Sequence, residues 1–267
     1  MPLLHIAIVA LIQGITEFLP ISSSGHLILL PNLTGLDDQG QAMDVAVHVG
    51  TLGAVILFFR QDVARVIAGL PRLAKGRTDD ADARLALGLI IATIPVVIAG
   101  LLMKLTGLDD AVRSIAVVGW ATLIFGLVLW WEDRGGEQSL EAEGWTPKHA
   151  LIMGLWQVLA LIPGTSRSGI TITGARHLGY NRHDAARLAM LMSIPTILAS
   201  GLLLTAEVAA EMNGALARDA AIGAVFAFVA ALAALSFMMR LLRSVSFTPY
   251  VIYRVFLGVA LLTIAYS

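Results

Sequence analysis

The chain has 267 residues, of which 57% are hydrophobic and 14% are charged, and its mean hydropathy is +0.81. A soluble globular domain carries about a quarter charged residues, so this composition excludes that class and indicates an integral membrane protein built from helices. The chain has no cysteine, which excludes disulfides and thiolate metal sites, and its formal net charge of −1 is uninformative by itself.

An apolar run from Leu3 to Leu30 contains a polar stretch at 13–26, with the sequence QGITEFLPISSSGH. A carboxylate, three hydroxyls and an imidazole are costly to bury in a membrane segment without water or partners. Pro20 and Gly25 also disfavour one straight helix. We therefore predict a broken helix that enters the membrane, turns between Pro20 and Gly25 and returns, so that its polar groups line a cavity.

Six further apolar segments have the length of about 20 residues that a membrane-spanning helix needs. They lie at about 42–59, 85–103, 113–131, 185–205, 219–239 and 249–266. Another apolar stretch, at about 149–163, runs into the motif PGTSRSG at 163–169. This stretch resembles the opening segment, because an apolar approach again leads to a Pro–Gly break and a cluster of hydroxyls.

The likeness predicts an internal repeat, with halves at about 1–133 and 145–267. Gln13 and Gln157 lie 144 positions apart (157 minus 13), and the same offset joins three further pairs: Ser24 and Ser168, Gly25 and Gly169, Gly35 and Gly179. Each half would hold one re-entrant hairpin and three spans, and an odd number of spans inverts the second half. The prediction is one membrane domain, an all-α polytopic protein with six transmembrane helices and two re-entrant helical hairpins in an inverted-topology repeat.

Basic residues gather on one predicted side of the membrane, above all in the connection 60–84. The opposite side holds only Lys104, Arg113 and Arg218 by the predicted alternation of the spans. The positive-inside rule then places the basic side in the cytoplasm, and both termini and the mouth of the first hairpin on the outer face.

The first broken segment offers metal-binding and proton-transfer chemistry. Gln13 and Glu17 are four residues apart and share a helix face, so the pair could hold a hard divalent cation together with substrate phosphates. The alternative is a glutamate hydrogen-bonded to hydroxyls for structural reasons. Ser22, Ser23 and Ser24, just ahead of His26, suggest a nucleophile and base or phosphate ligands and a proton donor; the alternative is that they only serve a tight turn.

The second broken segment offers anion binding. Its four consecutive polar residues combine hydroxyls, backbone amides and a guanidinium: Thr165, Ser166, Arg167 and Ser168. Arginine grips phosphate through two parallel hydrogen bonds, and a helix starting at about Ile170 would add backbone donors. Alternatively, Arg167 extends to the interface or neutralises Glu17, which the repeat would bring opposite to it.

Asp44 and His48 share a helix face within the predicted span 42–59. We interpret them as a pH-sensitive structural pair or as support for the site, and we do not expect catalysis from either.

These two polar motifs together resemble the undecaprenyl-diphosphate phosphatase family, also known as bacitracin-resistance proteins. The stretch 13–26 matches the (Glu/Gln)-x-x-x-Glu motif and the Ser/His box that follows it, and 163–169 matches the Pro-Gly-Thr-Ser-Arg-Ser-Gly box. The likeness spans the whole chain in length and segment order. Here the first motif residue is Gln13, which leaves Glu17 as the only carboxylate at that place.

The resemblance implies hydrolysis of undecaprenyl diphosphate to undecaprenyl phosphate in the bacterial inner membrane, recycling the lipid carrier for peptidoglycan synthesis and conferring bacitracin resistance. It implies a divalent cation, Mg²⁺ or Ca²⁺, at Glu17 and Gln13. Catalysis would rest on Glu17, Ser23, His26 and Arg167, in an order of nucleophile and proton donor that stays open. The residues that would bind the diphosphate are Ser22, Ser24, Thr165, Ser166, Arg167 and Ser168.

Two other activities fit the same pattern, and a third, non-catalytic alternative is a drug-sequestering or scaffold protein. Inverted repeats with broken helices are typical of secondary transporters, and a lipid flippase would use a similar site. The expected partners are the polyprenyl diphosphate substrate and membrane lipids, with a homodimer as a further option; we expect no nucleic acid.

Overall fold

The computed structural model describes residues 1–35, 39–135, 138–208 and 213–267, and within these ranges it contains helices and one isolated β-bridge but no strand. The first half comprises α1 (Leu3–Thr16), α2 (Ser23–Thr34), α3 (Gly40–Phe58), α4 (Arg60–Ala74), α5 (Ala81–Thr106), α6 (Leu108–Ala111) and α7 (Ile115–Arg134). The second comprises η1 (Ala142–Gly144), α8 (Pro147–Val158), η2 (Leu159–Leu161), α9 (Arg167–His177), α10 (Arg182–Val208), α11 (Gly214–Leu241) and α12 (Thr248–Tyr266).

Six of the described helices are long and apolar enough to cross a membrane: α3, α5, α7, α10, α11 and α12. They coincide with the six segments predicted from hydropathy, to within a few residues at each end. The prediction of an all-α, multi-pass membrane protein with six spans is confirmed.

Short polar residues set where several of these helices begin. A side-chain oxygen accepts a hydrogen bond from a backbone N–H in the first turn at each of these N-caps: Asp80, Ser114, Thr146, Ser166 and Asn213. Such caps satisfy donors that the helix itself leaves unpaired. They therefore fix the start of α5, α7, α8, α9 and α11 at defined residues.

Helix α4 was not expected from the sequence, which indicated only a basic connection at 60–84. It is amphipathic, because Val63, Val66 and Ile67 alternate with polar side chains at helical spacing. Arg72 near its end lies 2.6 Å from Asp80, and this hydrogen bond lowers the pKa of the Asp80 carboxyl. Hydropathy missed α4 because the segment has no continuous apolar run.

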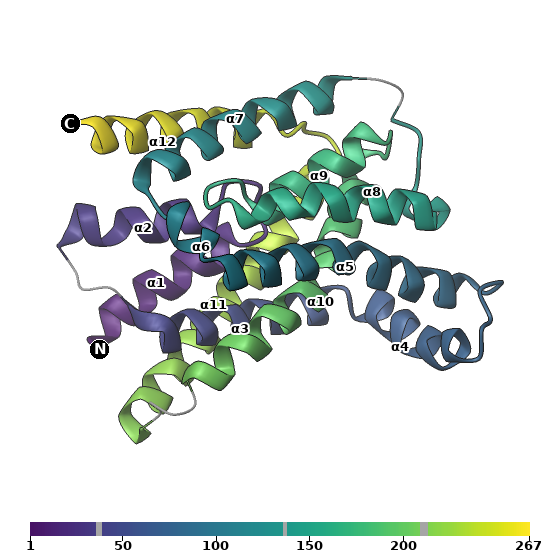
Figure 1. The fold of residues 1–267 in the computed structure, drawn as a ribbon, viewed down its shortest axis with the longest axis horizontal. Coiled ribbons are helices and arrows are strands. Elements are labelled where there is room, and N and C mark those ends of the chain that lie inside the picture. The colour runs from purple at the N-terminus through teal and green to yellow at the C-terminus, as the bar shows by residue number, and fades with distance from the viewer. Residues whose placement is uncertain (36–38, 136–137, 209–212) are drawn as a thin grey trace.

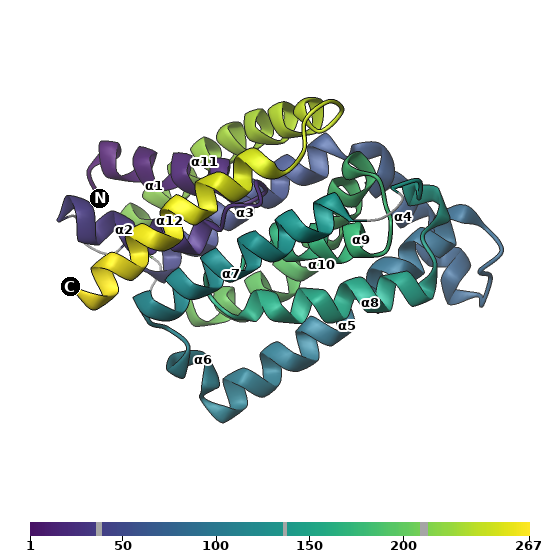
Figure 2. The ribbon, with the colours of Figure 1, turned by 90° about the horizontal axis from the view of Figure 1, so that it is seen from above.

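The helices lie side by side with both chain termini at one end of the molecule and α4 at the other (Figure 1). Helix α3 packs against α11, α7 against α12, and α5 against α8. Figure 2, seen from above, shows α1 and α2 beside α11 and α12, and α8 beside α5; α9 packs against α7, α8 and α10. The two short helix pairs, α1–α2 and α8–α9, are thus held among the long helices.

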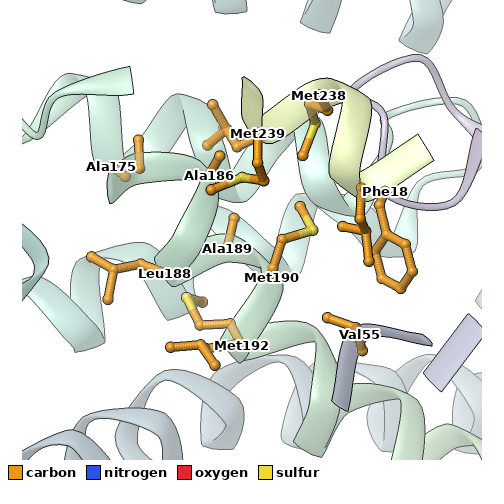
Figure 3. Packing of buried hydrophobic residues seen from close by; sticks show 14 of the residues in the cluster. Phe18, Val55, Ala175, Ala186, Leu188, Ala189, Met190, Met192, Met238 and Met239 are labelled. Carbon is orange, nitrogen blue, oxygen red and sulfur yellow. The ribbon is translucent and has the colours of Figure 1, made fainter. Parts of the chain in front are cut away.

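The largest buried cluster joins α10 and α11 to the first polar turn. Methionines and alanines of α10 and α11, including Met190 and Met238, fill it together with Val55 and Phe18 (Figure 3). Phe18 follows Glu17 directly and is fully buried. Its packing therefore anchors the backbone that carries Glu17.

Candidate active site

The breaks between α1 and α2 and between α8 and α9 face each other. The Ser24 hydroxyl accepts a hydrogen bond from the Gly164 N–H at 3.2 Å, and the Ser168 hydroxyl donates to the Leu19 carbonyl at 3.1 Å. Each break is thus bonded to the other through one serine. Polar groups from distant parts of the chain converge at this junction.

Both breaks depend on unusual backbone angles. Ser22 has φ of 73° and Ser166 has φ of 69°, and these are the only non-glycine residues with positive φ in the described ranges. Such a conformation costs about 1–3 kcal/mol and is retained where surrounding contacts demand it. Gly164 has φ of 92°, and a Cβ there would overlap the carbonyl oxygen of Val118. Only glycine fits at this position without a shift of α7.

A buried ion pair lies at the centre of the junction. Arg167 donates from Nη2 to Glu17 Oε1 at 2.6 Å and from Nη1 to the Ser193 carbonyl at 3.0 Å. The Glu17 and Arg167 side chains are 8% and 15% exposed. The structure therefore brings into contact the two side chains that the repeat was expected to place opposite each other. In a medium of low dielectric, removing either partner would strand the other charge.

The second oxygen of Glu17 collects two more donors. Gln13 Nε2 lies 2.7 Å from Glu17 Oε2, and Ser23 Oγ donates to the same oxygen at 3.0 Å. Glu17 thus holds a hydroxyl and a guanidinium on its two oxygens. This geometry places a potential nucleophile, Ser23, in contact with a carboxylate that can accept its proton.

These side chains border a cavity of about 190 Å³. One buried water needs only about 15 Å³, so the cavity has room for several waters or for a phosphate-sized group. Its lining is mostly polar and consists of Glu17, Ser22, Ser23, Ser24, His48, Ala160, Ile162, Gly164, Ser166 and Arg167.

Four predicted site residues do not line this cavity: Thr165, Ser168, His26 and Gln13, the last of which lies behind Glu17 and donates to it. Thr165 is fully buried, and its hydroxyl has no hydrogen-bond partner among the described residues. The Ser168 hydroxyl is engaged with Ser166 and with the backbone of the first break. Both residues support the turn from beneath, so their hydroxyls do not face the open space.

His26 is the third, and it is engaged on both ring nitrogens. Nδ1 lies 2.7 Å from the Ser22 carbonyl and Nε2 lies 2.6 Å from the Tyr253 hydroxyl, with the two rings stacked. Because a carbonyl only accepts, Nδ1 donates to Ser22, and Nε2 shares a hydrogen bond with the tyrosine hydroxyl. His26 is therefore held against α12 through both ring nitrogens, and its Nε2 has to leave Tyr253 before it can contact a substrate in the cavity.

His48 lies in the cavity wall instead. Its Nε2 is 3.2 Å from Gln13 Nε2 and 3.7 Å from Glu17 Oε2, and its Nδ1 donates to the Asp44 carbonyl at 2.7 Å. From the sequence, His48 and Asp44 are predicted to form a structural pair or to support the site. In the structure, His48 borders the cavity and Asp44 does not.

Sequence reasoning missed Arg254, which is fully buried in α12. Its guanidinium lies within 3.5 Å of five backbone carbonyls, those of Pro20, Ala121, Thr122, Gly164 and Thr165. No carboxylate pairs with it in the described part of the chain. Arg254 therefore ties both breaks to α7 and adds positive charge beneath the cavity. Its place in the middle of the predicted span 249–266 was the signal that could have revealed it.

Gln13 and Glu17 are the residues of this site that could hold a hard divalent cation. Gln13 Oε1 is buried and has no hydrogen-bond partner in the described residues, and it lies one helical turn from the Glu17 carboxylate. Within those residues no group of three or more His, Cys, Asp or Glu side chains gathers, so water and phosphate oxygens would have to complete the shell. That incomplete protein shell is typical of magnesium.

Comparisons with known proteins match the chain along its whole length. The family model described as "Bacitracin resistance protein BacA" matches residues 6–260. The chain is 68% identical to an undecaprenyl-diphosphatase of Ruegeria pomeroyi and 68% identical to one of Dinoroseobacter shibae, over 100% of each chain in both comparisons. It is 44% identical to an undecaprenyl-diphosphatase of Chromohalobacter salexigens over 97% of both chains.

Proposed function

The chain belongs to the bacitracin resistance protein BacA family, and on this premise we propose that it hydrolyses undecaprenyl diphosphate to undecaprenyl phosphate and inorganic phosphate. It is a membrane enzyme of the hydrolase class, whose reaction returns the lipid carrier to peptidoglycan synthesis and confers bacitracin resistance. The observation that carries this assignment within the structure is the contact of Glu17, Ser23 and Arg167 around one polar cavity.

The diphosphate head of the substrate binds in this cavity. Arg167 and the Ser22, Ser24 and Ser166 hydroxyls supply donors to its oxygens, and the N-terminus of α9 begins at Arg167 itself. The fully buried Arg254 adds charge from below without contacting the head. Phosphoryl transfer depends mostly on positioning and on stabilising negative charge, and these groups do both.

Ser23 is the nucleophile in the mechanism that the geometry supports best. Its Oγ attacks the terminal phosphorus while its proton passes to Glu17 Oε2, 3.0 Å away. The bond from that phosphorus to the bridging oxygen breaks, and undecaprenyl phosphate leaves with the bonding electrons. Water then cleaves the Ser23 phosphate ester, with Glu17 returning the proton to the Ser23 oxygen. His26 stays a candidate for proton transfer to the leaving group, after release from Tyr253.

Gln13 and Glu17 are the residues that would hold the divalent cation, Mg²⁺ or Ca²⁺. When bound, the cation neutralises phosphate oxygens and favours attack on phosphorus. Gln13 would contribute its unpartnered Oε1, and Glu17 would share its carboxylate between the cation, Ser23 and Arg167.

The two short helix pairs form re-entrant hairpins, and the chain is an inverted repeat. This is supported by matching contacts in the two halves: α1 packs on α11 as α8 packs on α5, and α2 contacts α12 as α9 contacts α7. The offset of 144 positions also joins Ser22 to Ser166, the two serines with positive φ. Both observations are expected if each half has the same path and the halves are related by a two-fold axis.

The protein lies in the inner membrane with its termini and the cavity mouth on the periplasmic side. Both termini lie at one end and α4 with its arginines at the other, which is the arrangement that the positive-inside rule requires (Figure 1). The polyprenyl substrate then enters from the outer leaflet. A homodimer stays a prediction. A secondary transporter or lipid flippase, the alternatives from the sequence, is not favoured, since the relatives are named for hydrolysis.

Phosphate release from undecaprenyl diphosphate by the purified protein in detergent tests this function. We expect release that is lost with EDTA, restored by a divalent cation, and abolished in Glu17→Gln and Ser23→Ala. Asp44→Ala is the matched control, because it removes a carboxylate from the same region without touching the cavity, and it should retain most of the activity. No release under any divalent cation would reject the assignment in favour of transport.

A further inference from the structure

A second large cavity lies at the end of the molecule opposite the chain termini. Its volume is about 610 Å³, and it opens where α3 passes into α4, where α10 begins and where α11 ends (Figure 1). It shares no residue with the cavity around Glu17. Its lining is Phe58, Phe59, Arg60, Gln61, Asp62, Arg65, His183, Arg187, Ser236, Met239, Arg240 and Arg243.

Five arginines and one carboxylate line this cavity, and the carboxylate is already engaged. Asp62 accepts from Arg187 at 2.6 and 3.1 Å and lies 3.5 Å from Arg65. Arg187 also pairs with Glu143 at 2.8 Å, and Arg65 pairs with Asp82 at 2.9 Å. These two arginines are therefore neutralised by neighbours and fix the shape of the cavity wall.

The other three arginines have no such neighbours. In the part of the chain that the structure describes, the side chains of Arg60, Arg240 and Arg243 form no hydrogen bond or ion pair, and all three residues are exposed to solvent. Three guanidinium groups around one cavity repel one another, and an anion between them would relieve this repulsion. The charge pattern therefore indicates a ligand with at least one phosphate-like group.

The cavity also has an apolar wall, made of Phe58, Phe59 and Met239. These residues end the membrane-spanning parts of α3 and α11, so the wall continues toward the bilayer core. A ligand that fits both walls carries an anionic head and an apolar tail. A free anion uses only the arginines.

We propose that this cavity binds the head of an anionic phospholipid, with Arg60, Arg240 and Arg243 around the phosphate. The part of the acyl chains nearest the head then lies along Phe58 and Phe59. The site is separate from the phosphatase reaction and rests on the proposed function only for the leaflet, which is the cytoplasmic one. That leaflet is rich in anionic lipids, and basic pockets between membrane helices on this side are suited to their headgroups.

Native mass spectrometry of the full-length protein in detergent tests the site, with added dioleoylphosphatidylglycerol or dioleoylphosphatidylcholine as probes. We expect the wild type to bind phosphatidylglycerol about tenfold more tightly, and Arg60→Gln/Arg240→Gln/Arg243→Gln to reduce that preference to about twofold or less. The matched control, Lys75→Gln/Arg77→Gln/Lys148→Gln, removes three exposed positive charges outside the cavity lining and should keep the preference. Phosphate release should be unchanged in both variants.

Three results would overturn the proposal. One is equal binding of the two lipids by the wild type, and another is equal loss of preference in the two triple variants, which would reduce the effect to general surface charge. The third is displacement of the lipid by millimolar inorganic phosphate, which would show a site for a free anion. If the triple variant unfolds by circular dichroism, Arg240→Gln alone should still weaken phosphatidylglycerol binding several-fold. Loss of phosphate release by the wild-type protein would bear on the proposed function of the active site and not on lipid binding in this cavity.

Discussion

The two breaks that meet at the active site have similar backbones and different chemistry. Residues 17–25 and 161–169 correspond under the offset of 144, and both contain a serine with φ near 70° at the same place, Ser22 and Ser166. Two residues later, Ser24 and Ser168 each form a hydrogen bond to the opposite break. The frame that positions the site is therefore present twice.

The reactive side chains are present once. Under the same offset, Glu17 corresponds to Leu161, Ser23 to Arg167, and the position of His26 is taken by Ile170. The first break thus supplies the carboxylate and the proposed nucleophile, and the second supplies the guanidinium that contacts the carboxylate. The comparison teaches that a repeated backbone makes a single site when its two copies carry complementary side chains.

Removal of the charge from the second break should have the largest effect on turnover. Arg167→Ala strands Glu17 and removes the main cation of the cavity, so we expect kcat/KM to fall by about 10³-fold or more. Phosphate release by the folded variant in detergent measures this. Arg167→Lys should recover only part of the loss, because lysine cannot bridge Glu17 and Ser193 as the planar guanidinium does. Normal turnover by Arg167→Ala would falsify the site.

Loss of Arg254, the clamp that ties both breaks to α7, should affect stability and activity together. Arg254→Met removes one hydrogen-bond donor from each of five carbonyls, which we expect to lower the free energy of unfolding by about 2–4 kcal/mol. Turnover should fall at least about tenfold, since the breaks lose their common anchor. Thermal unfolding and phosphate release in detergent measure the two effects. Arg77→Met, at an exposed position, serves as the control. An equal loss of stability and turnover in both variants would contradict the proposed role of Arg254 in holding the two breaks.

A glycine pair separates backbone strain from crowding at the second break. Gly164 and Gly107 both have positive φ, but of the two only Gly164 lies so close to another helix that a Cβ would overlap it, at Val118 of α7. Gly107→Ala should cost about 1 kcal/mol from conformation alone, whereas Gly164→Ala should cost about 2 kcal/mol more and reduce turnover. Thermal unfolding of the two variants distinguishes these values. Equal melting temperatures would mean that α7 yields to the added methyl.

The smallest effect is expected at the cavity wall. His48→Gln keeps a hydrogen-bonding group near Gln13 and Glu17 while removing the imidazole, so kcat/KM should fall by about threefold to tenfold. Steady-state kinetics with undecaprenyl diphosphate measure the change. A loss as large as that of Arg167→Ala would indicate that His48 takes part in catalysis. The first half of the chain would then supply one more reactive side chain than we propose.

Hydropathy and polar motifs predicted the spans and brought Glu17, Ser23 and Arg167 to one place, because long apolar runs and buried charges leave few alternatives. They missed α4, whose apolar residues are dispersed. The first break lies at 17–22, earlier than predicted, and α9 begins at Arg167, three residues before Ile170, because Ser166 caps it. The partners of His26 and Arg254 depend on how α12 packs, which one sequence does not reveal.

The position of Arg254 in the chain determines when, during synthesis and membrane insertion, the active site can be completed. Arg254 lies in α12, which is synthesised after α1 to α11, while the backbone carbonyls that it supports at Pro20 and Gly164 are made much earlier. A nascent chain that has inserted α1 to α11 carries Glu17, Ser23 and Arg167, but its two breaks are joined only by their direct contacts and lack the support of Arg254. We therefore expect full activity toward the lipid carrier only after α12 has entered the membrane, because Arg254 is then in place beneath both breaks.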